Sequence, residues 1–253
     1  MTFSSLMSVA RREVLAIAGL ALAAGGLLVF ASLADEIMEQ EPLHFDRVLL
    51  LALRTGDNND PIGPPWVEIM FTDLTSLGST TILALATLGV IGYLLIARRS
   101  GTALLVLGAV VGGTLLNNLL KLFFDRPRPD LVAHIVDTQT TSFPSGHAMI
   151  SAATYLTLGL LLARVQTRRI FRVYIIAVAI GITFLVGVSR VYLGVHWPSD
   201  VLAGWCAGAS WAILCWLLAI FLQRRHQIAP PGEEGAGPAT AEPDEAFPAS
   251  PVR

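Results

Sequence analysis

Residues 102–124 read TALLVLGAVVGGTLLNNLLKLFF and contain a single charged residue, Lys121, near the end of the run. A helix needs about 20 predominantly apolar residues to cross the roughly 30 Å hydrocarbon core of a bilayer. A backbone exposed to lipid must also satisfy its own hydrogen bonds, and a helix does so within one segment. The stretch therefore predicts a membrane-spanning helix that ends close to its lysine.

The rest of the chain repeats this pattern. Hydrophobic residues make up 54% of the sequence and charged residues only 14%, whereas an average soluble domain carries about 25% charged residues. We expect an all-α, polytopic membrane protein with six transmembrane helices. The six predicted spans are residues 14–34, 80–97, 102–124, 148–163, 173–189 and 201–222.

Basic residues indicate the orientation of the spans. Loops and ends rich in Lys and Arg stay on the cytoplasmic side, so both termini are expected to be cytoplasmic. The net charge of −2 gives no basis for nucleic-acid binding. The arginines that fall on one side are Arg11, Arg12, Arg98, Arg99, Arg164, Arg168, Arg169, Arg172, Arg224 and Arg225.

The predicted domain organisation is a cytoplasmic N-terminus (1–13), a six-helix domain (14–222) and a disordered cytoplasmic tail (223–253) rich in Pro, Ala, Gly and Glu. The outer segment, 35–79, carries one apolar helical face, which predicts a short helix in the membrane interface; a plain connector is the alternative. Ser32, Leu33 and Ala34 resemble a signal-peptide cleavage site, but the apolar stretch is long for one, which favours an uncleaved helix. The apolar face comprises Phe45, Val48, Leu49, Ala52 and Leu53.

Three polar clusters interrupt the apolar pattern at span ends. They read KLFFDRPRP (121–129), SFPSGH (142–147) and SRVYLGVHWPSD (189–200). In the predicted topology all three lie at the outer membrane face, so their side chains are expected to converge there.

Each cluster also has a purely structural explanation. Lys121 could extend to the lipid headgroups, Ser145 could cap a helix, and Asp200 could complement the start of the last span. Together, however, three cations gathered at one membrane face need an anion, and a phosphate group suits Arg and Lys. The cations are Lys121, Arg128 and Arg190, and Arg126, two positions before Arg128, is a further candidate.

A turn and two histidines complete the predicted site. Ser145 and Gly146 at a helix N-terminus would add backbone N–H donors for the same anion. His196 and Asp200 are one helical turn apart, so the carboxylate can orient the imidazole and stabilise its cationic form. His147 would then be free to act as a general acid.

The spacing of these residues resembles the three-part signature of the type 2 phosphatidic acid phosphatase (PAP2) superfamily, which also includes vanadium-dependent haloperoxidases. The resemblance extends from about residue 45 to 222 and includes the TSLGS stretch at 75–79. The membrane spans exclude the soluble haloperoxidase branch. The matching positions are Lys121, Arg128, Pro129, Pro144, Ser145, Gly146, His147, Ser189, Arg190, His196 and Asp200.

The resemblance implies roles for these residues. His196 would attack phosphorus and form a phosphohistidine, Asp200 would orient His196, and His147 would protonate the leaving oxygen and then activate water. Lys121, Arg128, Arg190, Ser145 and Gly146 would hold the phosphoryl oxygens. No metal and no cofactor are implied.

The expected function is that of an integral membrane phosphatase acting on a lipid phosphate or diphosphate. Undecaprenyl diphosphate, phosphatidic acid and phosphatidylglycerol phosphate are all open as substrates. A phosphotransferase is the first alternative, and a non-hydrolytic lipid transporter is a weaker one. The expected location is a bacterial inner membrane, with the site facing the periplasm or exterior.

Overall fold

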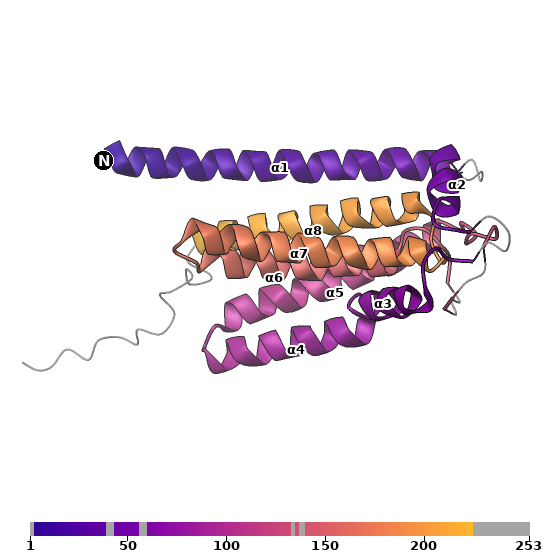
Figure 1. Cartoon of the computed structure of the whole chain (residues 1–253). Coiled ribbons are helices and arrows are strands. Elements are labelled where there is room, and N and C mark those ends of the chain that lie inside the picture. The colour runs from indigo at the N-terminus through magenta and orange to yellow at the C-terminus, as the bar shows by residue number, and fades with distance from the viewer. Residues whose placement is uncertain (1–2, 39–42, 56–59, 133–134, 137–139, 225–253) are drawn as a thin grey trace, which may run out of the picture.

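The computed structural model describes residues 3–38, 43–55, 60–132, 135–136 and 140–224. These residues form helices and no strand (Figure 1), as expected for an all-α protein. The predicted tail lies outside the described residues except for its first two, which end α8. The helices are α1 (Phe3–Met38), α2 (His44–Leu51), α3 (Pro65–Ser76), α4 (Thr80–Ile96), α5 (Ser100–Phe123), α6 (Gly146–Arg164), α7 (Arg169–Tyr192) and α8 (Pro198–Arg224).

All six predicted spans fall on helices. By length and composition, α1, α5, α6, α7 and α8 can each cross a membrane. The second predicted span forms α4, which has only 17 residues and reaches spanning length only together with α3. These two helices meet at an angle of 46°. The second span is therefore either a broken one or a re-entrant loop, and α3 lies within the predicted outer segment 35–79.

Helix α6 occupies the centre of the bundle and packs against α5, α7 and α8. Small residues make this close packing possible, as is usual between membrane helices. A Cβ atom at Gly159 would lie 2.9 Å from the Cβ atom of Ala179 on α7. By contrast, α1 lies at the edge of the bundle along α8 (Figure 1), where Ser210 Oγ donates a 3.0 Å hydrogen bond to the carbonyl oxygen of Ala23.

The outer segment contains both short helices, at one end of the bundle (Figure 1). The expected helix in this segment is α2, whose residues Phe45, Val48 and Leu49 are exposed. Its position in the membrane interface stays a prediction. The opposite face of α2 packs against the rest of the protein, because Asp46 and Leu50 are both fully buried.

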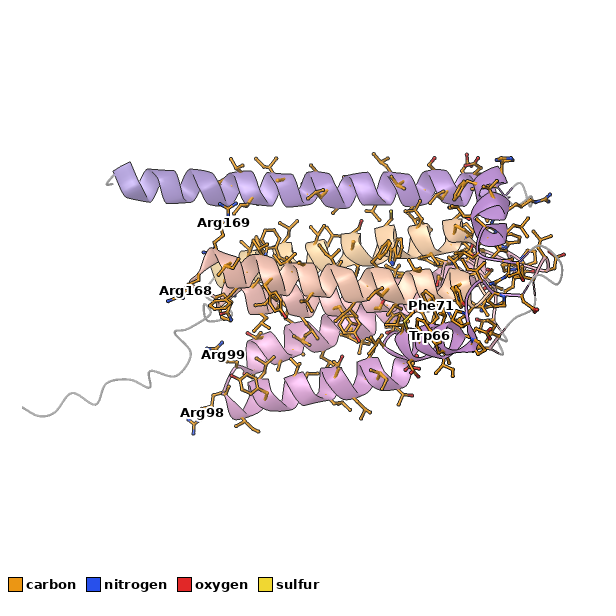
Figure 2. The ribbon with its side chains drawn as sticks, viewed as in Figure 1. Trp66, Phe71, Arg98, Arg99, Arg168 and Arg169 are labelled. Atoms are coloured by element: carbon orange, nitrogen blue, oxygen red, sulfur yellow. The ribbon has the colours of Figure 1, made fainter. Side chains whose placement is uncertain are left out.

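The two ends of the bundle differ in charge. Arg98, Arg99, Arg168 and Arg169 lie at the end where α1 begins, and Trp66 on α3 lies toward the other end (Figure 2). Grouping of these four arginines at one end is the arrangement that the predicted topology requires. The orientation of that end toward the cytoplasm stays a prediction.

Candidate active site

The three polar clusters meet at the end of the bundle opposite to that of Arg98, Arg99, Arg168 and Arg169 (Figure 2). Helices α5 and α7 end there, and helices α6 and α8 begin there. The cavity at this place has a volume of about 330 Å³, while Ser145 and Asp200, the two predicted site residues that do not line it, are fully buried. The predicted residues that line it are Lys121, Arg128, Gly146, His147, Arg190 and His196.

Local sequence explains why α6 and α8 begin side by side. Pro198 occupies the first position of α8, where its missing N–H costs no hydrogen bond. Asp200 then falls in the first turn, where a negative charge is favourable. The backbone N–H of Ser145 donates a 3.0 Å hydrogen bond to the carbonyl oxygen of Asp200, which ties the start of α6 to that of α8.

His196 has a carboxylate on one side of its ring and the cavity on the other. Its Nδ1 atom lies 3.5 Å from Asp200 Oδ2, and the same oxygen accepts hydrogen bonds from the Trp197 backbone N–H at 2.9 Å and from Ser142 Oγ. On the other side, Nη1 of Arg128 lies 3.4 Å from His196 Nε2. This arrangement favours a proton on Nδ1 and directs the Nε2 lone pair toward the cavity.

Burial keeps His196 neutral. The pKa of His196 is lowered to about 4, mainly because burial removes solvation; the nearby cations Arg190 and Arg128 act in the same direction, and the hydrogen bond to Asp200 opposes them. A neutral imidazole has a free lone pair, as a nucleophile requires.

The three predicted phosphate-binding cations are held by neutral oxygens. Lys121 Nζ donates to the Thr141 carbonyl at 2.6 Å, and Arg128 donates to the carbonyls of Val195 at 2.6 Å and Thr140 at 2.8 Å. These carbonyls fix the directions of the cations without neutralising their charge.

The third cation, Arg190, is 4% exposed and donates a 3.0 Å hydrogen bond to Thr75 Oγ1 at the end of α3. The buried Nε of Arg190 and the buried Oγ of Ser145 have no hydrogen-bond partner among the described residues. Ser145 therefore stands at the N-cap position of α6 without capping it through its side chain. Both atoms are donors that suit an anion.

Two glycines allow close approach at the start of α6, where Gly146 and His147 lie. A Cβ atom at Gly146 would lie 3.3 Å from Asn117 Nδ2, so the missing side chain lets α5 approach the start of α6. A Cβ atom at Gly78 would lie 3.3 Å from Cδ2 of His147. The break between α3 and α4 therefore forms a wall beside His147.

Arg126 was a further candidate among the cations, and in the structure it lies outside the cavity, between two carboxylates. Its Nη2 atom donates to Asp46 Oδ2 at 2.8 Å, and its Nη1 atom donates to Asp200 Oδ1 and to Ser199 Oγ. The sequence pattern did not single out Asp46, and it placed Ser142 in a polar cluster without a role, because the side-chain partners of both residues lie more than 50 positions away.

Within the described ranges, no three His, Cys, Asp or Glu side chains are grouped as a metal ion would require. The polar groups that line the cavity are mainly donors, which suit an anion and not a metal cation.

A family model described as the PAP2 superfamily matches residues 102–224, which contain all eight predicted site residues. Phosphatidylglycerophosphatase B of Bacillus subtilis is 38% identical over 151 residues, which are 58% of this chain and 72% of that protein. This chain belongs to the PAP2 superfamily.

Other relatives agree with this family. The chain is 36% identical over 162 residues to the lipid A 1-phosphatase of Rhizobium johnstonii, covering 56% of this chain and 61% of that protein. A crystal structure of a transmembrane PAP2-type phosphatidylglycerolphosphate phosphatase from Bacillus subtilis superposes with a TM-score of 0.64 at 27% identity. That superposition covers 81% of this chain and 98% of the other, so the PAP2 chain is an integral membrane protein of the same fold.

Proposed function

We propose that this PAP2 protein is a membrane phosphatase that hydrolyses a lipid phosphate through a phosphohistidine intermediate. The observation that carries the proposal is the arrangement around His196. Its Nδ1 atom faces Asp200, while its Nε2 atom faces a cavity lined by Lys121, Arg128 and Arg190. A nucleophile and a phosphate cradle thus share one cavity.

In the first step, His196 Nε2 attacks the phosphorus atom in line with the bond to the lipid oxygen. The N–P bond forms as the P–O bond breaks, and the departing oxygen keeps the electron pair. His147, which lines the same cavity, donates a proton to that oxygen. The products are a lipid alcohol and a phosphohistidine whose positive ring is stabilised by Asp200.

In the second step, His147 is neutral and accepts a proton from a water molecule. The water oxygen attacks phosphorus, the P–N bond breaks, and the electron pair returns to Nε2. Inorganic phosphate leaves, and His147 again carries the proton needed for the next cycle.

Charge stabilisation comes from the chain itself. Lys121, Arg128 and Arg190 are directed at the phosphoryl oxygens, whose charge is redistributed in the transition state. The buried donors of Arg190 and Ser145 add to these contacts. With three cations in place, the reaction needs no metal ion.

Phosphatidylglycerol phosphate is the first substrate to test. A cavity of about 330 Å³ lined by three cations and two histidines suits a phosphorylated headgroup and leaves the acyl chains in the bilayer. The relative from Bacillus subtilis is named for this substrate. Phosphatidic acid and undecaprenyl diphosphate present the same terminal phosphate to the cavity. The site would face the periplasm of a bacterial inner membrane, with both termini in the cytoplasm.

The test is phosphate release by the purified protein in detergent with EDTA present. The three lipids are assayed side by side with wild type, His196→Ala and His44→Ala. His44 is an exposed histidine on α2 and serves as the matched control. We expect EDTA-resistant release by wild type and His44→Ala and none by His196→Ala.

A second measurement tests the intermediate and separates hydrolysis from transfer. When the lipid carries a radioactive phosphate, wild type quenched in alkali during turnover should hold acid-labile phosphate on His196, whereas His196→Ala should hold none and His147→Ala should be slow in both steps. Phosphate release that EDTA abolishes, or that survives in His196→Ala, would contradict the mechanism. Product appearing only when an alcohol acceptor is added would favour the phosphotransferase.

A further inference from the structure

Asp46 is a buried carboxylate in the outer segment that the proposed reaction does not use. It is fully buried on α2 and has three partners. The Ser199 backbone N–H donates to Oδ1 at 2.7 Å, and Ser199 Oγ and Arg126 Nη2 donate to Oδ2 at 2.6 and 2.8 Å. The side-chain hydrogen bonds of Asp46 therefore lead to Ser199 at the start of α8 and to Arg126.

Arg126 continues the connection toward the nucleophile. Its side chain is 6% exposed and bridges Asp46 and Asp200, which are both fully buried. The guanidinium also lies 5.6 Å from the centre of the Trp197 ring. Asp200 in turn lies against His196 Nδ1, so a continuous chain of contacts runs from α2 to the imidazole.

The charges along this chain decide how strongly Asp200 acts on His196. Arg126 alone would neutralise Asp200, because a buried ion pair carries no net charge. With Asp46 included, two carboxylates and one guanidinium carry a net charge of −1. That charge is next to the imidazole, which becomes positive when Nε2 bonds to phosphorus.

We propose that Asp46 is a positioning residue that offsets the charge of Arg126, so that Asp200 keeps its negative charge toward His196. Arg126 holds the geometry of Asp200, and Asp46 preserves its charge. The proposal rests on the proposed function of His196 as nucleophile. It also gives α2 a role in the reaction without any contact with the cavity.

Stability alone is a weak reason for such a network. Replacing a buried ion pair or triad with apolar residues is often neutral or stabilising, whereas removing one partner leaves an uncompensated charge. Removal of both Asp46 and Arg126 therefore separates the two explanations. If Asp46 acts through its charge, the double variant regains activity, and if it acts only on stability, the double variant loses more.

The experiment compares wild type, Asp46→Asn and the double variant Asp46→Asn/Arg126→Gln, with Asp125→Asn as control. Asp125 is exposed and adjacent to Arg126 in sequence. Its substitution also removes one carboxylate, but one that does not belong to the group formed by Asp46, Arg126 and Asp200. The readouts are kcat and KM for phosphatidylglycerol phosphate, together with the melting temperature of each variant.

We expect Asp46→Asn to lower kcat by roughly 10-fold to 100-fold, the range found when a residue behind a functional ligand is removed. KM should stay within about twofold, because the phosphate-holding cations do not contact Asp46. The double variant restores the net charge of −1, so its kcat should exceed that of Asp46→Asn by at least about threefold. Asp125→Asn should match wild type.

A double variant with a kcat no higher than that of Asp46→Asn would overturn the proposal, because in a purely structural role each lost contact lowers kcat further. Wild-type kcat in folded Asp46→Asn would overturn it as well. If Asp46→Asn does not fold, the double variant decides alone: kcat within about tenfold of wild type supports the proposal, and a larger loss in a folded double variant overturns it.

Failure of the proposed function would be recognised separately. In that case wild type itself releases no phosphate, or His196→Ala releases it equally well. The effect of Asp46 on the interaction between Asp200 and His196 is then measured from the 15N signals of the His196 ring. Asp46→Asn should shift the Nδ1 signal and the double variant should return it toward the wild-type position, whereas unchanged signals in both would overturn the proposal.

Discussion

Arg190 on α7 donates a 3.0 Å hydrogen bond to Thr75 Oγ1 at the end of α3, although the two residues are 115 positions apart in sequence. The hydroxyl group is the only side-chain partner described for this cation. The contact places the break between α3 and α4 directly behind the phosphate cradle. Tyr155 strengthens the same junction, because its hydroxyl donates to the Leu77 carbonyl at 2.7 Å.

The first prediction concerns this contact. Thr75→Val keeps the shape of the side chain but leaves Arg190 without its hydroxyl acceptor. A hydrogen bond to a charged group contributes about 1.5–3 kcal/mol, so we expect kcat/KM for the lipid phosphate to fall by roughly tenfold or more. Steady-state kinetics in detergent micelles measures the change.

Two variants serve as controls for Thr75→Val. Thr75→Ser keeps the hydroxyl and should stay near wild type. Thr72→Val makes the same change one turn earlier on α3, where the hydroxyl donates only to the Glu68 carbonyl of its own helix. Equal losses in Thr72→Val and Thr75→Val would show that the hydroxyl of Thr75 has no special role.

The sequence predicted the helical bundle and the meeting of the three polar clusters because both follow from local patterns along the chain. Long apolar runs indicate spans, and alternation of the spans brings the three polar clusters to one end. Lys121, Arg128, His147, Arg190 and His196 all line the cavity, and their catalytic and phosphate-binding roles stay predictions. Each of these residues lies within a few positions of a helix end, so its location follows directly from the topology.

The remaining features depend on contacts that no local pattern reveals. Helix α3 carries Glu68 and Asp73, which interrupt its apolar character, so the apolar pattern gave no sign that α3 and α4 together reach spanning length. Asp46 is on a short helix whose apolar residues predicted only an interfacial position. Its partner Arg126 is 80 residues away, and only the packing of α2 against α8 brings them together.

The second prediction concerns the charge of His196. Burial lowers its pKa to about 4, so the folded ring gains a proton only as the pH falls toward that value. An unfolded histidine, with a pKa of about 6.5, gains its proton earlier. We therefore expect the 15N signals of the folded ring to stay constant between roughly pH 5.5 and 7.5.

The His196 signals are assigned by their absence in His196→Ala, and denatured protein provides the reference titration. A midpoint near 6.5 in the folded protein would show that the ring is solvated, and the cause assigned to the shift would be wrong. Nucleophilic attack would then compete with protonation near neutral pH.

The third prediction concerns orientation. Trp66 is 62% exposed on α3, and Arg168 lies at the other end of the bundle (Figure 2). If the arginine-rich end is cytoplasmic, a membrane-impermeant maleimide applied to intact spheroplasts should label Trp66→Cys and not Arg168→Cys. Permeabilised cells, in which both should react, are the control for reactivity. Labelling of Arg168→Cys alone would reverse the proposed orientation.

The fourth prediction tests the packing that holds the two helix starts together. A Cβ atom at Gly204 on α8 would lie 2.8 Å from the Ser145 carbonyl oxygen and 3.1 Å from the Ala148 Cβ atom. Because the carbonyl belongs to the backbone, Gly204→Ala must push α6 and α8 apart. Overpacking of this kind costs about 1–3 kcal/mol, so we expect a lower melting temperature.

The same displacement should also reduce activity, because Ser145, Gly146 and His147 form the start of α6. Gly89→Ala on α4 is the matched control, since a Cβ atom there meets nothing within 4 Å. The two variants are compared by thermal unfolding in detergent and by kcat/KM. A Gly204→Ala protein that melts and turns over like Gly89→Ala would show that α6 and α8 can separate slightly without disturbing the cavity.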